Sequence, residues 1–210
     1  MDGLSAGAAL ISAVTLGLLS LSAHPPGAPG VFLCALMAVS LLGFWWHNRA
    51  PASIFMGDSG SLATGYMLAV LSVPGSLNGH FGMTAFNSLF LLLVPGVALS
   101  VFVFDAVFVS TTRFIRALKI YRGGFDHSSH RLVRLGFSEK QAVLILQAIA
   151  CSGGLIALLT RIFPEQILPL VGLFVLALFV FGAYLGQVRL THDPGPSNTV
   201  SYTHLTLPTN

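Results

Sequence analysis

The chain has 210 residues, of which 54% are hydrophobic and only 8% are charged. A soluble domain has about 25% charged residues, so this composition excludes an ordinary soluble protein and predicts one embedded in a lipid bilayer. The formal net charge of +3 suits anionic lipid headgroups or a phosphorylated substrate, and it gives no reason to expect nucleic-acid binding.

Six apolar stretches follow one another along the chain, and most approach the roughly 20 residues that a helix needs to cross a bilayer. Continuous apolar runs indicate helices, because barrel strands alternate apolar and polar residues. We therefore predict an all-α, polytopic membrane helix bundle with about six spans, over residues 4–22, 31–46, 62–74, 85–110, 141–162 and 166–186.

The two ends of the chain differ in character. Residues 1–190 are expected to form one transmembrane domain, and residues 191–210 a tail. Within this tail, residues 200–210 resemble translated sequencing-adapter read-through, and we give them no functional role.

The basic residues orient the predicted bundle. All of them except Arg161 fall in loops reached after an even number of crossings, so the positive-inside rule places those loops in the cytoplasm. The amino terminus, the loop at Asp58, the loop at His127 and the tail are then cytoplasmic. Cys34 and Cys151 fall inside predicted spans, where we expect small, buried apolar residues.

The loop between the second and third spans places Asp58 among small residues, in the order Gly57-Asp58-Ser59-Gly60-Ser61. The glycines let the backbone approach a ligand, the hydroxyls and amides can face phosphate oxygens, and the carboxylate can hold a metal ion. The alternative is a helix N-cap, in which Asp58 or Ser59 binds the first amides of the third span. A cap would leave the neighbouring Asn48 and Phe55 unexplained.

A second polar cluster precedes the fifth span. His127 and His130 are three residues apart and Arg131 follows, so one helical turn would let all three meet an anion. A basic loop at the lipid headgroups is an open alternative, whereas a zinc site is weakly supported because the pattern has neither cysteine nor HExxH spacing. Upstream, Asp105 falls in the fourth span, where an unpaired charge costs a few kcal/mol, so we expect it to pair with Arg113 or Arg116.

Together, these clusters resemble those of the polyprenyl-phosphate N-acetylhexosamine-1-phosphate transferases. The resemblance rests on Asp2-Gly3-Leu4 with the following Gly7, on Asn48 to Ser61 and on Asp126 to Gly136. The last two segments read N-x-x-P-A-x-x-F-M-G-D-x-G-S and D-H-x-x-H-R-L-x-x-L-G. The similarity extends to about residue 186 and corresponds to the later half of such an enzyme.

The resemblance implies roles for the residues of the first loop. Asp58 would be a ligand of Mg²⁺, with Mn²⁺ as an alternative ion. Asn48 and Phe55 would hold the uridine, the aromatic ring by stacking on the base, and Gly57 and Ser59 would flank the metal ligand at the substrate.

The resemblance also implies roles for the other two motifs. His127, His130 and Arg131 would engage the diphosphate of the UDP-sugar. Asp2 matches the last aspartate of the family motif N-x-x-D-G-x-D-G-L, so it joins the expected catalytic residues. Ser129 stands where many members have another histidine, which disfavours the peptidoglycan translocase.

The implied reaction joins UDP-N-acetylhexosamine to polyprenyl (undecaprenyl) phosphate, giving polyprenyl-diphospho-sugar and UMP at the cytoplasmic face of a bacterial inner membrane. The product would initiate cell-envelope polysaccharide synthesis. The family's adjacent aspartate pair would lie upstream of Met1, so we expect an amino-terminally truncated chain that is inactive alone. An inactive scaffold of the same fold and, less favoured, a secondary transporter are the alternatives, and a homodimer is left open.

Overall fold

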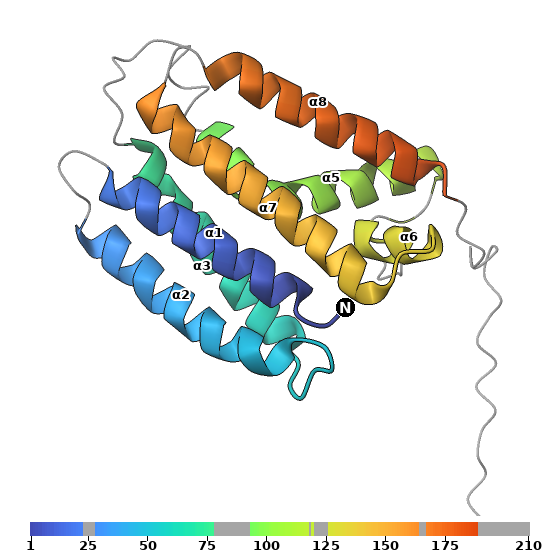
Figure 1. The fold of residues 1–210 in the computed structure, drawn as a ribbon, viewed down its shortest axis with the longest axis horizontal. Helices are drawn as coiled ribbons and strands as arrows, with labels where there is room; N and C mark the ends of the chain where they lie inside the picture. The colour runs from blue at the N-terminus through green and yellow to red at the C-terminus, as the bar shows by residue number, and fades with distance from the viewer. Residues whose placement is uncertain (23–27, 78–92, 118, 120–125, 164–166, 189–210) are drawn as a thin grey trace, which may run out of the picture.

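The computed structural model describes residues 1–22, 28–77, 93–117, 119, 126–163 and 167–188. The regular elements in this part of the chain are helices (Figure 1). They are α1 (Leu4–Leu21), α2 (Ala28–Asn48), α3 (Gly57–Leu77), α5 (Ser100–Ile115), α6 (Ser128–Arg134), α7 (Glu139–Ile162) and α8 (Ile167–Gly186). The prediction of an all-α membrane bundle is confirmed, whereas the predicted tail at 191–210 lies outside the described residues.

Four of the described helices are long and apolar enough to cross a membrane, over Leu4–Leu21, Pro29–Asn48, Glu139–Ile162 and Ile167–Gly186. The third predicted span corresponds to α3, which begins at Gly57 because the polar loop sequence forms its first turn. The fourth corresponds to a helical stretch at 93–98 that leads into α5, and its first part, 85–92, lies outside the described residues.

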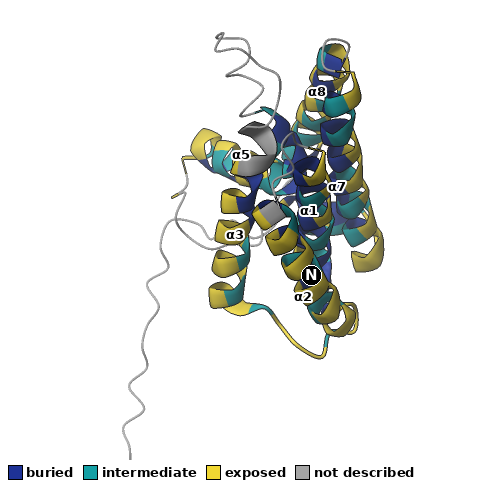
Figure 2. Cartoon of the chain, turned by 90° about the vertical axis from the view of Figure 1, so that its left-hand side faces the viewer, coloured by how far each residue is buried: buried dark blue, intermediate teal, exposed yellow. Residues whose placement is uncertain are grey.

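Helices α1 and α7 form the centre of the bundle. Helices α2 and α3 pack against α1, while α5, α6 and α8 pack against α7. Of the residues in the α1 span, 56% are buried, against 11% in α2 and in α8, so these two outer helices present apolar side chains to the lipid. Figure 2 shows the same contrast, with exposed residues on the outer faces of α2 and α3.

Small residues make the central position of α1 possible. Its buried face includes Ala6, Gly7, Ala9, Ser12 and Ala13. Side chains of this size let the backbones of neighbouring helices approach closely, which is the usual basis of helix packing in membranes.

The connection between α6 and α7 is fixed by its own hydrogen bonds. Gly136 has a φ of 99°, which glycine adopts without strain, and it lets the chain turn after α6. Ser138 then caps α7: its Oγ accepts from the N–H of Gln141 at 3.3 Å, while its own N–H donates to Gln141 Oε1 at 2.9 Å. This reciprocal pair sets the direction in which α7 leaves the site.

The two cysteines have different environments. Cys34 is buried, as expected, but Cys151 is exposed on α7, so the expectation of a second buried thiol is wrong. An apolar position inside a span can face lipid as readily as protein, and hydropathy does not distinguish the two.

Gly153 provides a test of the packing between α7 and the segment that leads into α5. A methyl group there would collide with Ser100 Oγ and the carbonyl oxygen of Val97. Overpacking of this kind costs about 1–3 kcal/mol, which outweighs the roughly 1 kcal/mol that alanine gains in helix propensity. We expect Gly153→Ala to lower the melting temperature in detergent, whereas Gly172→Ala, with open space around it, should not.

The measurement is thermal denaturation followed by labelling of the buried Cys34 thiol, with Cys151→Ser as the common background. Equal melting temperatures for the two alanine variants would contradict the packing described here.

Candidate functional site

The backbone N–H and C=O of Gly3 join three helices at the start of α1. Gly3 is the N-cap residue of α1 and has a φ of 74°, a left-handed conformation that glycine adopts without strain. Its N–H donates to Asn48 Oδ1, and its carbonyl accepts from Gln147 Nε2, both at 3.1 Å. These bonds tie α1 to the last residue of α2 and to the middle of α7.

The same turn holds the loop that connects α2 and α3. Buried Asn48 donates from Nδ2 to the carbonyl of Ile54 at 2.8 Å, and Asp2 Oδ2 accepts from the N–H of Ala52 at 3.1 Å. The first two sequence motifs are therefore in direct contact. Asn48 shapes the loop, and because Nδ2 carries a second hydrogen, its predicted contact with a nucleotide is compatible with this geometry.

The loop leads to an exposed aromatic ring and an exposed carboxylate. Phe55 is 76% exposed, which is unusual for an apolar ring outside the predicted spans. Asp58 lies in the first turn of α3, where the helix dipole favours a negative charge, and Gly57 and Ser59 beside it are exposed. The N-cap alternative is not adopted, because the helix begins before Asp58.

The donor set at Asp58 fits a magnesium ion that is shared with a substrate. Mg²⁺ typically takes one or two protein carboxylates and completes its shell with water and phosphate oxygens. The Asp58 carboxylate is exposed, and the neighbouring Ser61 hydroxyl is bound to the backbone carbonyl of Asp58 at 2.9 Å. Within the described ranges, no three His, Cys, Asp or Glu side chains gather to form a complete metal site by themselves.

A second cluster forms where α5 meets the start of α6. Asp105 Oδ2 lies 2.7 Å from His127 Nδ1, and Asp105 Oδ1 accepts from the N–H and the hydroxyl of Ser128 at 2.9 Å and 2.6 Å. The expected pairing of Asp105 with Arg113 or Arg116 is therefore wrong. The first amide of α6 and the adjacent side chains satisfy this carboxylate instead.

Arg113 pairs with Asp126, the residue that precedes His127. Its Nε and Nη2 donate to the two carboxylate oxygens, each at 2.6 Å, and both side chains are nearly buried. This two-pronged hydrogen bond from Arg113 lowers the pKa of Asp126 below its ordinary value. The pair ties the end of α5 to the start of residues 126–131, which carry both histidines and are called the histidine segment below.

Arg131 lies in the interior, with 1% of its surface exposed. Its guanidinium donates to the carbonyls of Asp126 and Leu185 at 3.3 Å and 3.0 Å and lies 4.8 Å from the centre of the Phe108 ring. A cation at the carboxyl end of α8 also opposes the negative end of that helix dipole. The structure thus places this predicted diphosphate ligand where it holds α6 to α8.

The pKa values of the two histidines shift in opposite directions. The hydrogen bond to Asp105 raises the pKa of His127, whereas burial lowers the pKa of His130. The amino group of Met1 also lowers the pKa of His130, and Met1 packs in the same apolar cluster as Leu132 of α6. The turn at Asp2 and helix α6 therefore lie at the same end of the bundle, near the N label in Figure 1.

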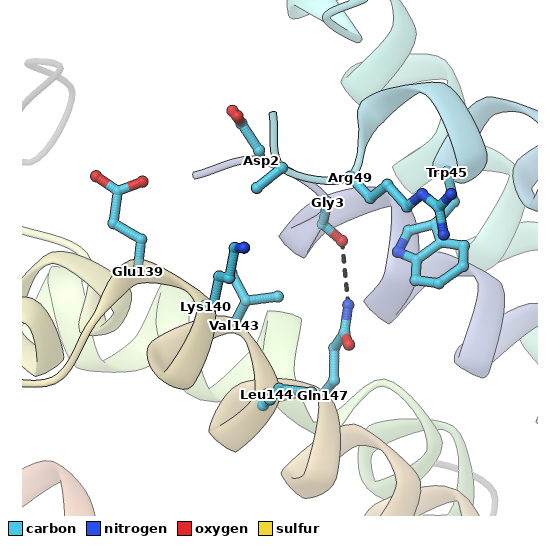
Figure 3. A pocket seen from close by; sticks show the side chains of 10 residues that line it. Asp2, Gly3, Trp45, Arg49, Glu139, Lys140, Val143, Leu144 and Gln147 are labelled. Carbon is cyan, nitrogen blue, oxygen red and sulfur yellow. Dashed lines mark hydrogen bonds between the residues drawn. The ribbon is translucent and has the colours of Figure 1, made fainter. Parts of the chain in front are cut away.

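A cavity of about 310 Å³ adjoins the Asp2 turn, between the starts of α1 and α7 and the end of α2. Figure 3 shows the Gln147 amide reaching the Gly3 carbonyl at its wall. Its lining carries both signs of charge, from Asp2, Arg49, Glu139 and Lys140. Sequence reasoning missed Gln147, because an amide inside an apolar span has no motif, although a polar residue there is itself a signal of a buried partner.

A larger cavity of about 740 Å³ forms a groove between α5 and α8. Its walls are mostly apolar, and its polar lining is concentrated toward the carboxyl end of α5, at Thr111, Thr112 and Arg116. An apolar groove with hydroxyls and a cation at one end matches an amphiphile with an anionic head.

Comparison with known proteins agrees with these features. A family model described as glycosyl transferase family 4 matches residues 1–76. The chain is 33% identical over 150 residues to a protein of Bacillus subtilis named as a probable undecaprenyl-phosphate N-acetylglucosaminyl 1-phosphate transferase. That match covers 71% of this chain and 39% of the relative.

Two further relatives have similar coverage. The chain is 32% identical to the decaprenyl-phosphate N-acetylglucosaminephosphotransferase of Mycobacterium leprae, over 70% of this chain and 39% of the relative. It is 35% identical to a phospho-N-acetylmuramoyl-pentapeptide-transferase of a Picosynechococcus strain, over 68% of this chain and 36% of the relative. The chain thus spans well under half the length of the relatives that it matches.

The buried position of Arg131 gives a stability prediction. Arg131→Met keeps most of the volume but leaves the carbonyls of Asp126 and Leu185 without their donor, which should cost about 3 kcal/mol. We expect a clear fall in melting temperature in detergent. The matched control is Arg134→Met on the exposed side of the same helix, which should change little. Equal melting temperatures would mean that Arg131 does not hold α6 to α8.

Proposed function

Because this chain belongs to glycosyl transferase family 4, in which its relatives are named as transferases of sugar phosphates to polyprenyl phosphates, we propose that it serves the transfer of an N-acetylhexosamine-1-phosphate from a UDP-sugar to polyprenyl phosphate. The products would be polyprenyl-diphospho-sugar and UMP. The observation that carries the proposal is the contact of the Asp2-Gly3 turn with the loop that presents Phe55 and Asp58.

The proposed reaction brings together two anionic substrates, the UDP-sugar and polyprenyl phosphate, so the site has to offset the repulsion between them. Asp58 would hold Mg²⁺, which when bound neutralises charge on the diphosphate oxygens. The fixed hydrogen bonds of Asn48 and Asp2 orient the loop, so that Asp58 and Phe55 keep their relative positions when a substrate enters.

The exposure of the Phe55 ring supports the proposal that it binds the nucleotide. An aromatic ring that is exposed beside a phosphate-binding loop can stack on a base, and burial of that ring by the base would contribute to affinity. The exposed position is what a stacking platform requires before its ligand arrives.

The groove between α5 and α8 supports the proposal that the acceptor is a lipid. Its apolar walls suit an isoprenoid chain, and its polar end, with Arg116, would lie beside the phosphate. In this proposal the acceptor enters from the bilayer and the nucleotide-sugar enters from the cytoplasm.

The assay uses the full-length product of the gene, since the matched region is 39% of the first relative and we propose that this chain does not complete the reaction by itself. Purified protein is given a panel of UDP-N-acetylhexosamines with undecaprenyl phosphate and Mg²⁺, and then with Mn²⁺. Formation of UMP and a lipid-linked sugar diphosphate is expected. Absence of both products would favour an inactive scaffold of the same fold.

Asp58→Asn tests the metal ligand. Loss of a metal-binding carboxylate at a phosphoryl-transfer centre should reduce turnover at least about a hundredfold while membrane insertion is unchanged. Asp58→Glu is the matched comparison, because it keeps a carboxylate in the first turn of α3 and should retain more turnover than Asp58→Asn. Turnover of the Asp58→Asn variant at the wild-type rate in saturating magnesium would exclude the metal role.

Phe55→Ala tests the stacking platform. Removal of a base-stacking ring costs about 1–3 kcal/mol, so the KM for the UDP-sugar should rise about 5-fold or more, with little change for the lipid. Phe114→Ala on α5, where the ring is equally exposed at 77%, is the control. A change in the KM for the lipid alone would contradict the uridine assignment.

A further inference from the structure

Asp105 is a second point, besides the Arg113–Asp126 pair, at which α5 contacts the start of the histidine segment. Both of its carboxylate oxygens are used, one by His127 Nδ1 and the other by the amide and hydroxyl of Ser128. The bonds from Ser128 fix the orientation of the Asp105 carboxylate, and the carboxylate in turn fixes the orientation of the His127 imidazole.

This arrangement determines which nitrogen of His127 can meet a ligand. Nδ1 is bound at 2.7 Å, while the side chain remains 49% exposed, so Nε2 is the nitrogen left for a partner outside this pair. A carboxylate on one ring nitrogen is the common device that fixes the orientation of an imidazole whose other nitrogen is functional.

We propose that Asp105 is a positioning residue, which holds His127 through Nδ1 so that the Nε2–H of its imidazolium serves as a fixed cationic donor to the diphosphate of the nucleotide-sugar. This inference rests on the proposed function. It assigns Asp105, for which the sequence predicted only a pairing with Arg113 or Arg116, to the site.

The charges around His127 favour the imidazolium. Asp105 and Asp126 raise the pKa of His127, whereas burial and Arg113 lower it. The charge of His127 in turn lowers the pKa of the nearby His130. Because the folded-state pKa is raised, the charged pair forms fully at pH values below the pKa of an unfolded histidine. The pair is lost as the pH rises through the folded-state value.

The first measurement is the titration of ¹³C-labelled histidines by NMR, on this chain in detergent micelles. In the wild type, the pKa of His127 should lie above the ordinary histidine value and that of His130 below it. Asp105→Asn should lower the pKa of His127, since the amide carries no charge. Ser128→Ala keeps the carboxylate and is the matched control, so His127 should still titrate above its ordinary value.

The second measurement is the pH dependence of kcat/KM for the UDP-sugar, on the full-length protein. At a pH between the pKa of His127 in the Asp105→Asn variant and its pKa in the wild type, both taken from the titration, loss of one charge-assisted hydrogen bond is expected to reduce kcat/KM of the variant about tenfold. At a pH below both of these pKa values, where His127 carries its proton in the variant as well, the reduction should be about twofold or less. A role confined to tying α5 to α6 would not be rescued by acid.

The outcomes separate the two proposals. An unshifted His127 titration in Asp105→Asn, or a loss of activity of the same size at both pH values, overturns the positioning role while leaving the proposed function in place. If the wild-type full-length protein transfers no sugar phosphate, the nucleotide-sugar is not the ligand and both proposals fail. The titration then still shows whether the pair forms.

Discussion

The hydrogen bonds of the Gly3 backbone are the constraint on which the rest of the site depends. Asn48 binds its N–H and Gln147 binds its carbonyl, so the backbone of one residue sets the spacing of α1, α2 and α7. Asn48 passes this constraint on to the loop that ends at Asp58, through its bond to Ile54.

Helix α6 depends on buried charges in a comparable way. A helix of 7 residues is too short to be stable in isolation, so its position must come from tertiary contacts. Arg113 with Asp126 fixes the segment before it, and Arg131 fixes it against the carboxyl end of α8. Such charges are costly to bury, and they are tolerated here because each has several hydrogen-bonding partners. The basic side chains of this region therefore differ in exposure: Arg131 is buried, whereas the His127 side chain is half exposed.

Sequence patterns predicted the helical class, the approximate spans and the two polar clusters, because hydropathy and residue type are local properties. They did not predict that Arg131 is buried, that Asp105 pairs with His127, or that Cys151 is exposed. Each of these depends on which helix faces which, and the uniformly apolar spans of a membrane protein have little periodicity that reports it. The start of α3 could not be predicted for another reason: glycine and serine favour loops, although here they form the first turn of the helix around Asp58.

The small-residue face of α1 has a consequence for how this protein can vary. Where alanine, glycine and serine separate packed backbones, almost any substitution adds volume, so α1 should admit few replacements on its buried face. On α8, where most side chains face lipid, one large apolar residue can replace another at little cost. Tolerance of substitution should therefore increase with distance from the axis of the bundle, and the small buried residues of α1 would be among the hardest to replace.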